Sequence, residues 1–574
     1  YFLWNSNCLY SHMQTIRGRI KKATSTPRGR IIALSLLVLI MAAVIGGVIY
    51  WKIYRKQIIR GELEGLVNKK SGGLYQLRYD SLFLDEAGGN LAIHGIEVNY
   101  DSVQYSRLND ADIPPTLVKL SIPTLMVMGV QTPRALLNKE IVGKKLTINQ
   151  PRIDIYYTDA GADSARYIPP EEIYAQILGN LNLIRLDTLE LLDGNITTYK
   201  LKSNKKAVEL NNTSVRLLNL ELDKNAEIPE GRILFSKNIV LNVGQVSFPS
   251  DNRPYKYQID QISMNSLDGS GSVAKFRVIP LMKEDAFVRS LPFQDDRFDF
   301  NIQNIRFVNL DIPRLFDEEI FADSLILGSA NMKIYRDLAL KRDKKNRVGT
   351  YPHQLLARIP LTLDIKKLVV NAGYVEYKER NHITRQSGKV RFHNVSAVFN
   401  NVTNDSASIS RNNIVTARMN AKFLDKTPLK VNWKFYLGNP RGRFDVEGSL
   451  GSIAAKDVNQ LTEPMGPARL EDGRIQSLYF NFDADNYKAN GKVKMLYENL
   501  KLSLLEKQDG KKELDKKTVA SFVANIVVKN DNPTKKDEAR VSDVAFERDT
   551  NRSIFHLVWK SIFKGVRETV GIKK

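Results

Sequence analysis

The middle of the chain repeats one pattern of apolar and polar positions. In Leu368–Tyr377, apolar residues stand at the first and third positions, a small residue at the sixth, and apolar residues again at the eighth and tenth. The same template fits stretches that begin at Leu146, Leu189, Ile239 and Leu325. The first residues of successive copies are 43, 50, 86 and 43 residues apart, so a degenerate copy is expected around residues 259–270, in the longest interval.

Alternation with a period of two predicts β-strands that have one polar and one apolar face. The small residue in the middle of the template predicts a bulge or a tight bend. Recurrence at this length predicts one supersecondary unit stacked repeatedly into an elongated body. The alternative is an ordinary series of antiparallel strands whose similarity arose by chance.

Longer strands are expected from Thr416 onward. Leu429, Val431, Trp433 and Phe435 alternate with polar residues, and residues 439–442 form a turn by composition. A short helix is expected from Asp457 to Leu461, followed by further strands around residues 478–482 and 493–505. The pattern over residues 514–528 fits either a helix or a strand. The basic stretch 341–347 is predicted to be a surface loop.

The N-terminal part contains a candidate membrane anchor. Residues 31–50 carry no charge over 20 residues, which is enough for a helix to cross ~30 Å of hydrocarbon. Trp51 and Tyr54 then suit the far membrane interface, and a helical stripe continues to about Val67. The basic residues before the stretch outnumber those after it, which favours a cytoplasmic N-terminus. A cleaved signal peptide is the alternative, and Met13 is the expected natural start.

The C-terminal stretch 554–572 has the pattern of a basic amphipathic helix. Phe555, Trp559 and Phe563 form one row, while Lys560 and Lys564 lie on the other side. This pattern is typical of a helix at a membrane interface. A helix that caps the apolar end of the β body is an equally good interpretation, and one helix could serve both purposes.

Together these patterns predict a mainly β chain with an N-terminal transmembrane helix, an elongated, twisted, antiparallel β-groove, a few short helices and a C-terminal amphipathic helix. The expected divisions are a basic cytoplasmic segment (1–30), the transmembrane helix (31–51), a juxtamembrane helix (52–73), the repeated β region (74–410), a C-terminal β region (411–545) and the amphipathic helix (546–574).

Composition narrows the function classes. The net charge is +22 and the basic residues are spread along the whole chain without a nucleic-acid-binding motif, which favours anionic lipid head groups as the counter-surface. The one cysteine, Cys8, excludes an intramolecular disulfide framework. The six histidines are scattered and no nucleotide-binding or nucleophile motif is present. We therefore expect no enzyme, no metal and no cofactor.

The C-terminal region also resembles a known family. Its motifs are PLKVNWKFYLGNPRGRFDVEGSLG (428–451), DVNQLTEPMGPARLEDGRIQSLYFNF (457–482) and KANGKVKMLYENLKLSLL (488–505). This region resembles the C-terminal part of AsmA-like proteins, and the anchor followed by β repeats matches the layout of that family. The resemblance implies an inner-membrane-anchored periplasmic protein of Gram-negative bacteria, related to TamB and to chorein-type bridge proteins. Such proteins are thought to shield acyl chains in a long β groove.

The resemblance and the pattern agree on a lipid-handling function. An apolar sheet face needs a cover, and few amphipathic helices are visible to supply one. We therefore expect a groove that binds or conducts phospholipid acyl chains for outer-membrane biogenesis. The alternative is a periplasmic scaffold or assembly factor for outer-membrane proteins. The candidate lining residues are Leu189, Leu191, Ile196, Ile239, Leu241, Val246, Leu368, Val370, Val375, Tyr377, Leu429, Val431, Trp433 and Phe435.

Overall fold

A computed structural model describes most of the chain from Val67 onward. The described residues are 67–68, 71–85, 87–109, 113–114, 116–131, 134, 138–157, 181–223, 232, 235–250, 253–315, 317–382, 385–465, 468–507, 514–516, 529–534 and 538–571. The candidate anchor 31–51, with Trp51 and Tyr54, lies outside these residues. Within them, no helix combines the length and the apolar character needed to cross a membrane.

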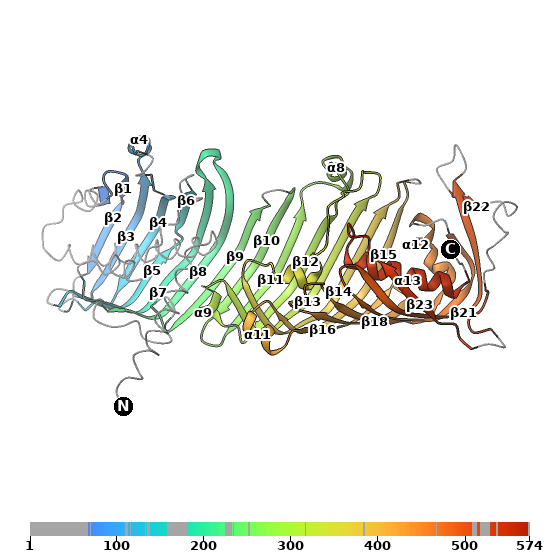
Figure 1. Cartoon of the computed structure of the whole chain (residues 1–574). Helices are drawn as coiled ribbons and strands as arrows, with labels where there is room; N and C mark the ends of the chain where they lie inside the picture. Colours follow the sequence, from blue (N-terminus) through green and yellow to red (C-terminus); the bar gives the residue numbers. More distant parts are fainter. Residues whose placement is uncertain are drawn as a thin grey trace, which may run out of the picture. The chain divides into compact units, whose positions relative to one another are not determined.

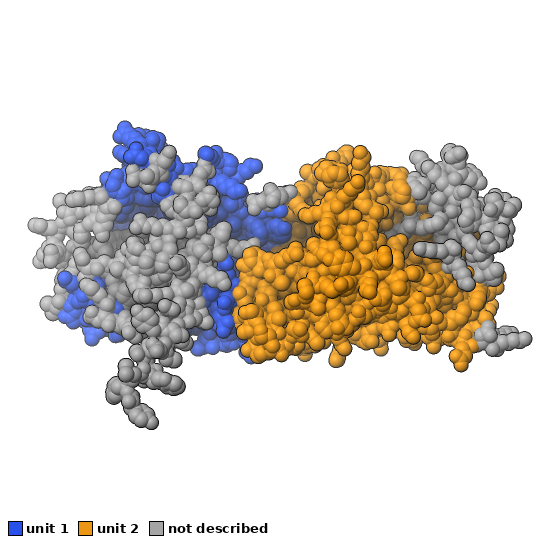
Figure 2. All heavy atoms as spheres, in the orientation of Figure 1, with its two compact units in different colours: residues 1–251, 257–274, 308–320 blue, residues 252–256, 275–307, 321–574 orange. Residues whose placement is uncertain are grey.

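The chain divides into two compact units, coloured blue and orange in Figure 2. Unit 1 comprises residues 1–251, 257–274 and 308–320, and unit 2 comprises residues 252–256, 275–307 and 321–574. Both units are built mainly from β-strands, as the alternating pattern predicts (Figure 1).

Among its described residues, unit 1 contains nine complete strands and three complete short helices. The strands are β1 (Tyr75–Arg78), β2 (Ser81–Asp85), β3 (Asn90–Tyr100), β4 (Thr116–Met128), β5 (Glu140–Asn149), β6 (Arg152–Tyr157), β7 (Leu183–Lys200), β8 (Lys205–Asp223) and β9 (Asn238–Pro249). The short helices are α4 (Ser102–Ser106), η1 (Leu201–Ser203) and α9 (Ile312–Leu315).

Strand β7 lies parallel to both β5 and β6, whereas the other registers within unit 1 are antiparallel. The sheet is therefore mixed, and the prediction of a purely antiparallel groove is wrong on this point. Pro151 divides one sequence repeat into β5 and β6, and both pair with the same long strand. Alternation of side chains is the same in parallel and antiparallel strands, so the pattern does not reveal direction.

Buried aliphatic side chains form one large core in unit 1. Leu125, Ile155 and Leu189 are among its least exposed residues. The candidate lining residues Leu189, Leu191, Ile196 and Ile239 belong to this core, each no more than 7% exposed. Leu241 and Val246 of β9 are half-buried.

Unit 2 contains the later strands. They are β14 (Thr362–Arg380), β15 (Ser387–Thr403), β16 (Ile414–Phe423), β17 (Thr427–Tyr436), β18 (Phe444–Leu450), β19 (Ile453–Ala454), β20 (Ala468–Ala484), β21 (Lys488–Lys507), β22 (Leu514–Lys516) and β23 (Ser542–Glu547). Residues of both units occur in β10 (Tyr255–Asn265), β11 (Ser270–Pro280), β12 (Arg297–Val308) and β13 (Glu319–Asp337).

The helices of unit 2 are short except for the last. They are α8 (Glu284–Arg289), α10 (Pro352–Leu356), α11 (Ser406–Arg411), η2 (Ala455–Val458), α12 (Asn459–Met465) and α13 (Ile554–Thr569). The structure confirms the predicted C-terminal helix and the turn before β18, where Gly438 and Gly442 have positive φ. Residues 341–348 are in neither helix nor strand, as predicted for this loop.

Strands β13 and β14 run in the same direction. Asp323 near the start of β13 pairs with Lys366 near the start of β14, and the Leu338 N–H after β13 donates to the Arg380 carbonyl at the end of β14. A parallel pair needs a connection that returns along the strands. Residues 338–361 make this connection and are called the crossover segment below.

The repeat template corresponds to strands that are interrupted by a bulge. Val375 stands an odd number of positions after Leu368 and Val370, so simple alternation would place it on the opposite face of β14. Through β15, however, the three residues are paired with Ala417, Met419 and Phe423 of β16, which are separated by even numbers of positions and therefore share one face. The register shifts between His393 and Ser396, where Asn394 adopts a left-handed φ of 49°. A bulge of this kind restores the apolar residues to the same face.

Glycines at two bulges lie opposite left-handed asparagines on the neighbouring strand. Gly244 is the small residue of its template copy, whereas Gly328 stands two positions before Ala330, the small residue of the copy that begins at Leu325. A β-carbon at Gly244 would stand 2.9 Å from the Cβ of Asn212, and one at Gly328 would stand 2.7 Å from the Cβ of Asn304. Both asparagines have positive φ, 52° and 53°. The bulged asparagine fits against the glycine because the glycine has no side chain. The predicted bulge is therefore confirmed, and its left-handed residue lies on the partner strand.

Candidate functional site

The inner face of unit 2 carries rows of apolar side chains that cross several strands. In one row Val370 pairs with Ala397, Ala397 with Met419, and Met419 with Val431. The next row joins Leu368, Phe399, Ala417, Trp433 and Val446 in the same way. Residues paired directly across strands point to the same side of a sheet. Six half-buried members of these rows, called the apolar floor, are Leu368, Val370, Phe399, Met419, Val431 and Trp433.

The large side chains of these rows are more buried on the C-terminal strands than on β14–β17. The side chains at Leu368 and Val370 are only half-buried, whereas Val446 is 2% exposed and Phe482 is 3% exposed. The difference arises because α13 and Tyr351 pack over β18, β20, β21 and β23 in a second core. The apolar floor on β14–β17 is therefore the part of this face with the least protein cover.

Helix α13 borders the apolar floor with a row of aromatic side chains. Phe555, Trp559 and Phe563, called the aromatic row, are 67%, 43% and 44% exposed. They are spaced by four residues and so lie along one side of the helix. The ring of Phe555 meets the ring of Trp433 edge to face, with 6.5 Å between centroids. This contact joins the row to the floor.

The opposite side of α13 is fixed to the sheet. Ile554, Leu557 and Val558 are buried in the core that also contains Val493 and Val544. The Ser542 hydroxyl donates to the Gly565 carbonyl, and the Lys564 Nζ donates to the Ala545 carbonyl. The capping interpretation of this helix is therefore correct, while its exposed side remains available for a membrane or a ligand.

The crossover segment is anchored beside the first turn of α13 by a buried arginine. Arg548, 7% exposed, donates to the carbonyls of Asn486, Arg347 and Arg552, and its guanidinium lies 4.3 Å from the centre of the Tyr351 ring. The Tyr351 hydroxyl donates to the Asp485 carbonyl, and burial raises the pKa of this hydroxyl. The arginine and the tyrosine thus tie three distant parts of the chain together.

Near the end of β14 the candidate lining is not purely apolar, because Tyr377 contributes a hydroxyl group. Burial raises the pKa of its hydroxyl, which donates to Glu379 Oε2 at 2.7 Å. Val375 and Tyr377 are half-buried and lie beyond the bulge from Val370. Val375 is opposite Phe392, which is opposite Phe423 in a small core covered by α12.

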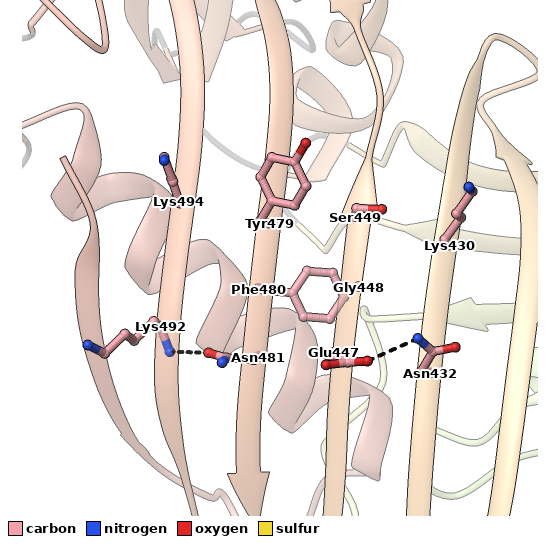
Figure 3. Close-up of a pocket in the computed structure, with 10 residues that line it drawn as sticks. All are labelled: Lys430, Asn432, Glu447, Gly448, Ser449, Tyr479, Phe480, Asn481, Lys492 and Lys494. Atoms are coloured by element: carbon pink, nitrogen blue, oxygen red, sulfur yellow. Dashed lines mark hydrogen bonds between the residues drawn. The ribbon is translucent and has the colours of Figure 1, made fainter. Parts of the chain in front are cut away.

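The polar face of the same strands carries a shallow pocket of about 470 Å³ (Figure 3). Lys430, Lys492 and Lys494 surround it, and Glu447 accepts a hydrogen bond from Asn432. These side chains occupy the positions that alternate with the floor residues. The pocket therefore belongs to the solvated side of the sheet and is separate from the apolar floor.

The fourteen candidate lining residues occupy different environments. Four lie in the core of unit 1, Leu241 and Val246 are half-buried on β9, and the other eight are in unit 2. Of these eight, Leu368, Val370, Val431 and Trp433 share the apolar floor, Phe435 is buried at 9% exposed, and Leu429 packs against the core under α12. Among the interfacial candidates, Phe555, Trp559 and Lys560 are exposed, whereas Lys564 is half-buried.

Sequence reasoning missed Met419 and Phe399, which complete the rows between β14 and β17. Met419 lies in the strand that starts at Ile414, and Phe399 lies in the second half of β15, beyond the bulge at Asn394. Alternation within each strand would identify both as inward-facing. The spacing of the repeat template alone did not, because these strands carry no copy of it.

The arrangement offers an apolar surface rather than reactive groups. In the described part of the chain, no three His, Cys, Asp or Glu side chains are placed to hold a metal ion. The sequence matches no protein-family model, and it matches no curated protein sequence. The apolar floor and the aromatic row thus present a partly uncovered apolar surface on unit 2.

Proposed function

We propose that this chain binds the acyl chains of lipids along the apolar floor and the aromatic row of unit 2. The proposal rests on one observation: paired apolar side chains run across β14–β17 half-buried and meet an exposed row of aromatic rings on α13. Each methylene removed from water contributes about 0.8 kcal/mol, so an acyl chain needs no polar anchor to bind such a surface. The buried candidates of unit 1 act as core residues in this proposal.

The proposed cellular setting is the inner membrane of a Gram-negative bacterium, with the body in the periplasm. It is supported by the uncharged stretch 31–50 and by the resemblance of residues 416–505 to AsmA-like proteins. In that setting the chain contributes to phospholipid transport and outer-membrane biogenesis. The membrane and a phospholipid are then its partners.

Site-specific photocrosslinking tests the proposal. A photoreactive phenylalanine analogue is placed at Met419 on the floor and, in a matched variant, at the adjacent exposed Arg418 on the polar face. After irradiation in cells, lipids attached to the purified full chain are identified by mass spectrometry. We expect phospholipid adducts from position 419 and none from position 418.

The pair of Val431 and Asn432 provides a second test of the same kind on β17. Equal labelling by the inner and outer positions, or no lipid from either inner position, would overturn the proposal. Crosslinks from positions 419 and 431 to protein alone would instead favour the assembly-factor alternative.

A further inference from the structure

The connection between β11 and β12 in unit 2, which contains helix α8, has an exposed apolar tip. Leu281, Met282 and Phe293, called the α8 tip, are 62%, 36% and 46% exposed. The helix itself is held in place by Phe287, which is 2% exposed and packs against the Tyr255 ring at 6.1 Å between centroids. Figure 1 shows α8 beyond the ends of the neighbouring strands. Large apolar side chains on a rigid support are thus presented to solvent.

The acidic side chains around the α8 tip are neutralised by cations from neighbouring strands. Four carboxylates of this connection each form an ion pair at 3.0 Å or less. The pairs are Glu284–Lys378, Asp285–Arg380, Asp295–Arg253 and Asp296–Arg336. The negative charge of the connection is therefore compensated toward the sheet.

Five exposed cations of the same region are not compensated in this way, although Arg342 of the loop after β13 pairs with Asp549. Lys283 stands directly before α8 and Arg289 is the last residue of this helix, and both are exposed. A basic loop, defined by Lys341, Lys344 and Lys345, begins directly beside Phe293, because Gln294 bonds to the carbonyls of Leu338, Leu340 and Lys341. None of these five cations lies within 4.0 Å of a carboxylate oxygen in the described part of the chain. Apolar side chains and unpaired cations thus share one rim.

We propose that the α8 tip and the basic loop form a docking surface for an anionic phospholipid bilayer. Leu281, Met282 and Phe293 enter the interfacial region of the bilayer, where apolar side chains are removed from water. The five cations then contact anionic head groups. This combination favours a bilayer over a purely polar polyanion, which would leave the exposed Phe293 and Leu281 without a partner. The inference is independent of acyl-chain binding on the floor.

A fluorescent probe at position 293 tests the docking. In a full-length Cys8→Ser background, Phe293→Cys is labelled with an environment-sensitive dye, and Tyr479→Cys on the polar face is the matched control with 50% exposure. Each protein is reconstituted into phosphatidylcholine vesicles with or without phosphatidylglycerol. We expect a blue shift and quenching by lipid-borne quenchers at position 293 only, and only with the anionic lipid. The same response at both positions, no response at 293, or one independent of phosphatidylglycerol would overturn the proposal.

Charge reversal separates local docking from general attraction. The variant Lys341→Glu/Lys344→Glu/Lys345→Glu should weaken partitioning of the tip by more than about a hundredfold, since each lost basic residue costs about fivefold and each added carboxylate is repelled by the anionic surface. The matched variant Lys430→Glu/Lys434→Glu/Lys494→Glu changes the net charge equally on the polar sheet face. We expect the second variant to keep the response at position 293. Equal loss in both variants would show attraction by net charge alone and overturn the assignment.

Discussion

Gly565 of α13 lies so close to Val493 of β21 that a β-carbon on residue 565 would stand 2.5 Å from the valine Cβ. The same atom would be 3.0 Å from the Cγ2 of Val544 on β23. The helix reaches the sheet because residue 565 has no side chain, and this approach fixes the height at which the aromatic row stands beside the apolar floor.

Gly565→Ala should destabilise the protein by about 1–3 kcal/mol, although alanine is the better helix former, because the new methyl group overpacks the contact. Urea unfolding followed by tryptophan fluorescence measures the effect. Glu568→Ala, at an exposed position of the same helix, should change stability by less than about 0.5 kcal/mol. Adding Val493→Ala to Gly565→Ala should recover part of the loss, and a stabilised single variant would contradict the packing described.

Val370→Asp should leave the protein folded and abolish acyl-chain binding, because a half-buried carboxylate can stay hydrated but is repelled from hydrocarbon. Val446→Asp, on the same face at 2% exposure, should cost more than about 3 kcal/mol. Thermal unfolding and lipid mass spectrometry on both purified variants distinguish the two effects. Equal unfolding of both would mean that the floor is an ordinary core.

Arg548→Met should destabilise the protein by about 3 kcal/mol, because four carbonyl or amide oxygens would lose a charged donor and Tyr351 would lose its cation. Lysine should not restore stability, since its ammonium group cannot reproduce the fork geometry of the guanidinium. Urea denaturation of the two variants provides the measurement. Arg289→Met on exposed α8 is the control, and a lysine variant as stable as the parent would argue against directed hydrogen bonding.

Stability should fall as the pH is lowered from 7 to 4, in part because of His353. This side chain is 5% exposed and packs against Phe435, and burial lowers its pKa to about 4. In the unfolded chain the histidine titrates near 6.5, so the unfolded state takes up the proton first and is favoured by acid. The contribution is on the order of 2–3 kcal/mol at pH 4.

His353→Phe should remove this part of the pH dependence. The comparison is the free energy of unfolding at pH 7 and at pH 4.5 in both proteins, with exposed His382→Gln as the control. Identical slopes in the parent and His353→Phe would show that the histidine is already charged when folded.

Gly244→Val should cost about 2 kcal/mol, because its side chain would meet Asn212 at the bulge. Asn212→Gly should be tolerated, whereas Asn212→Val should cost about 1–2 kcal/mol since a β-branched residue resists a φ of 52°. Differential scanning calorimetry measures these changes, with exposed Asn242→Ala as the control. Tolerance of valine at both positions would mean that the bulge can relax.

The strands and α13 could be predicted from the sequence, because alternation with a period of two and aromatic residues spaced by four are local signals. Strand direction could not, since β7 would alternate in the same way beside an antiparallel neighbour. Nor could burial: Leu189 and Leu368 occupy the same position of the repeat, yet the first is fully buried and the second is half-buried. The difference depends on what packs against each face.

The anchoring of the crossover segment could not be predicted from the sequence either. Arg548 and Arg347 are 201 residues apart, and neither stands in a recognisable motif. Because the guanidinium of Arg548 donates its hydrogen bonds to carbonyl and amide oxygens, there is no acidic partner among the described residues whose position in the sequence could indicate its burial. The contact between Gly244 and Asn212 at the bulge could not be predicted either, because a connection and parts of two strands separate the two residues along the chain.

The interrupted strands restrict how this protein can change length. Leu368 and Val370 share a face with Val375 only because one irregular step compensates for the odd number of positions between them. Deleting a single amino acid there would move every later side chain of the strand to the opposite face. Tyr377 would then face water, and its charged neighbours would face the apolar side of the sheet. Small insertions and deletions should therefore survive in the connecting turns, and within the strands only when the irregular step is gained or lost at the same time.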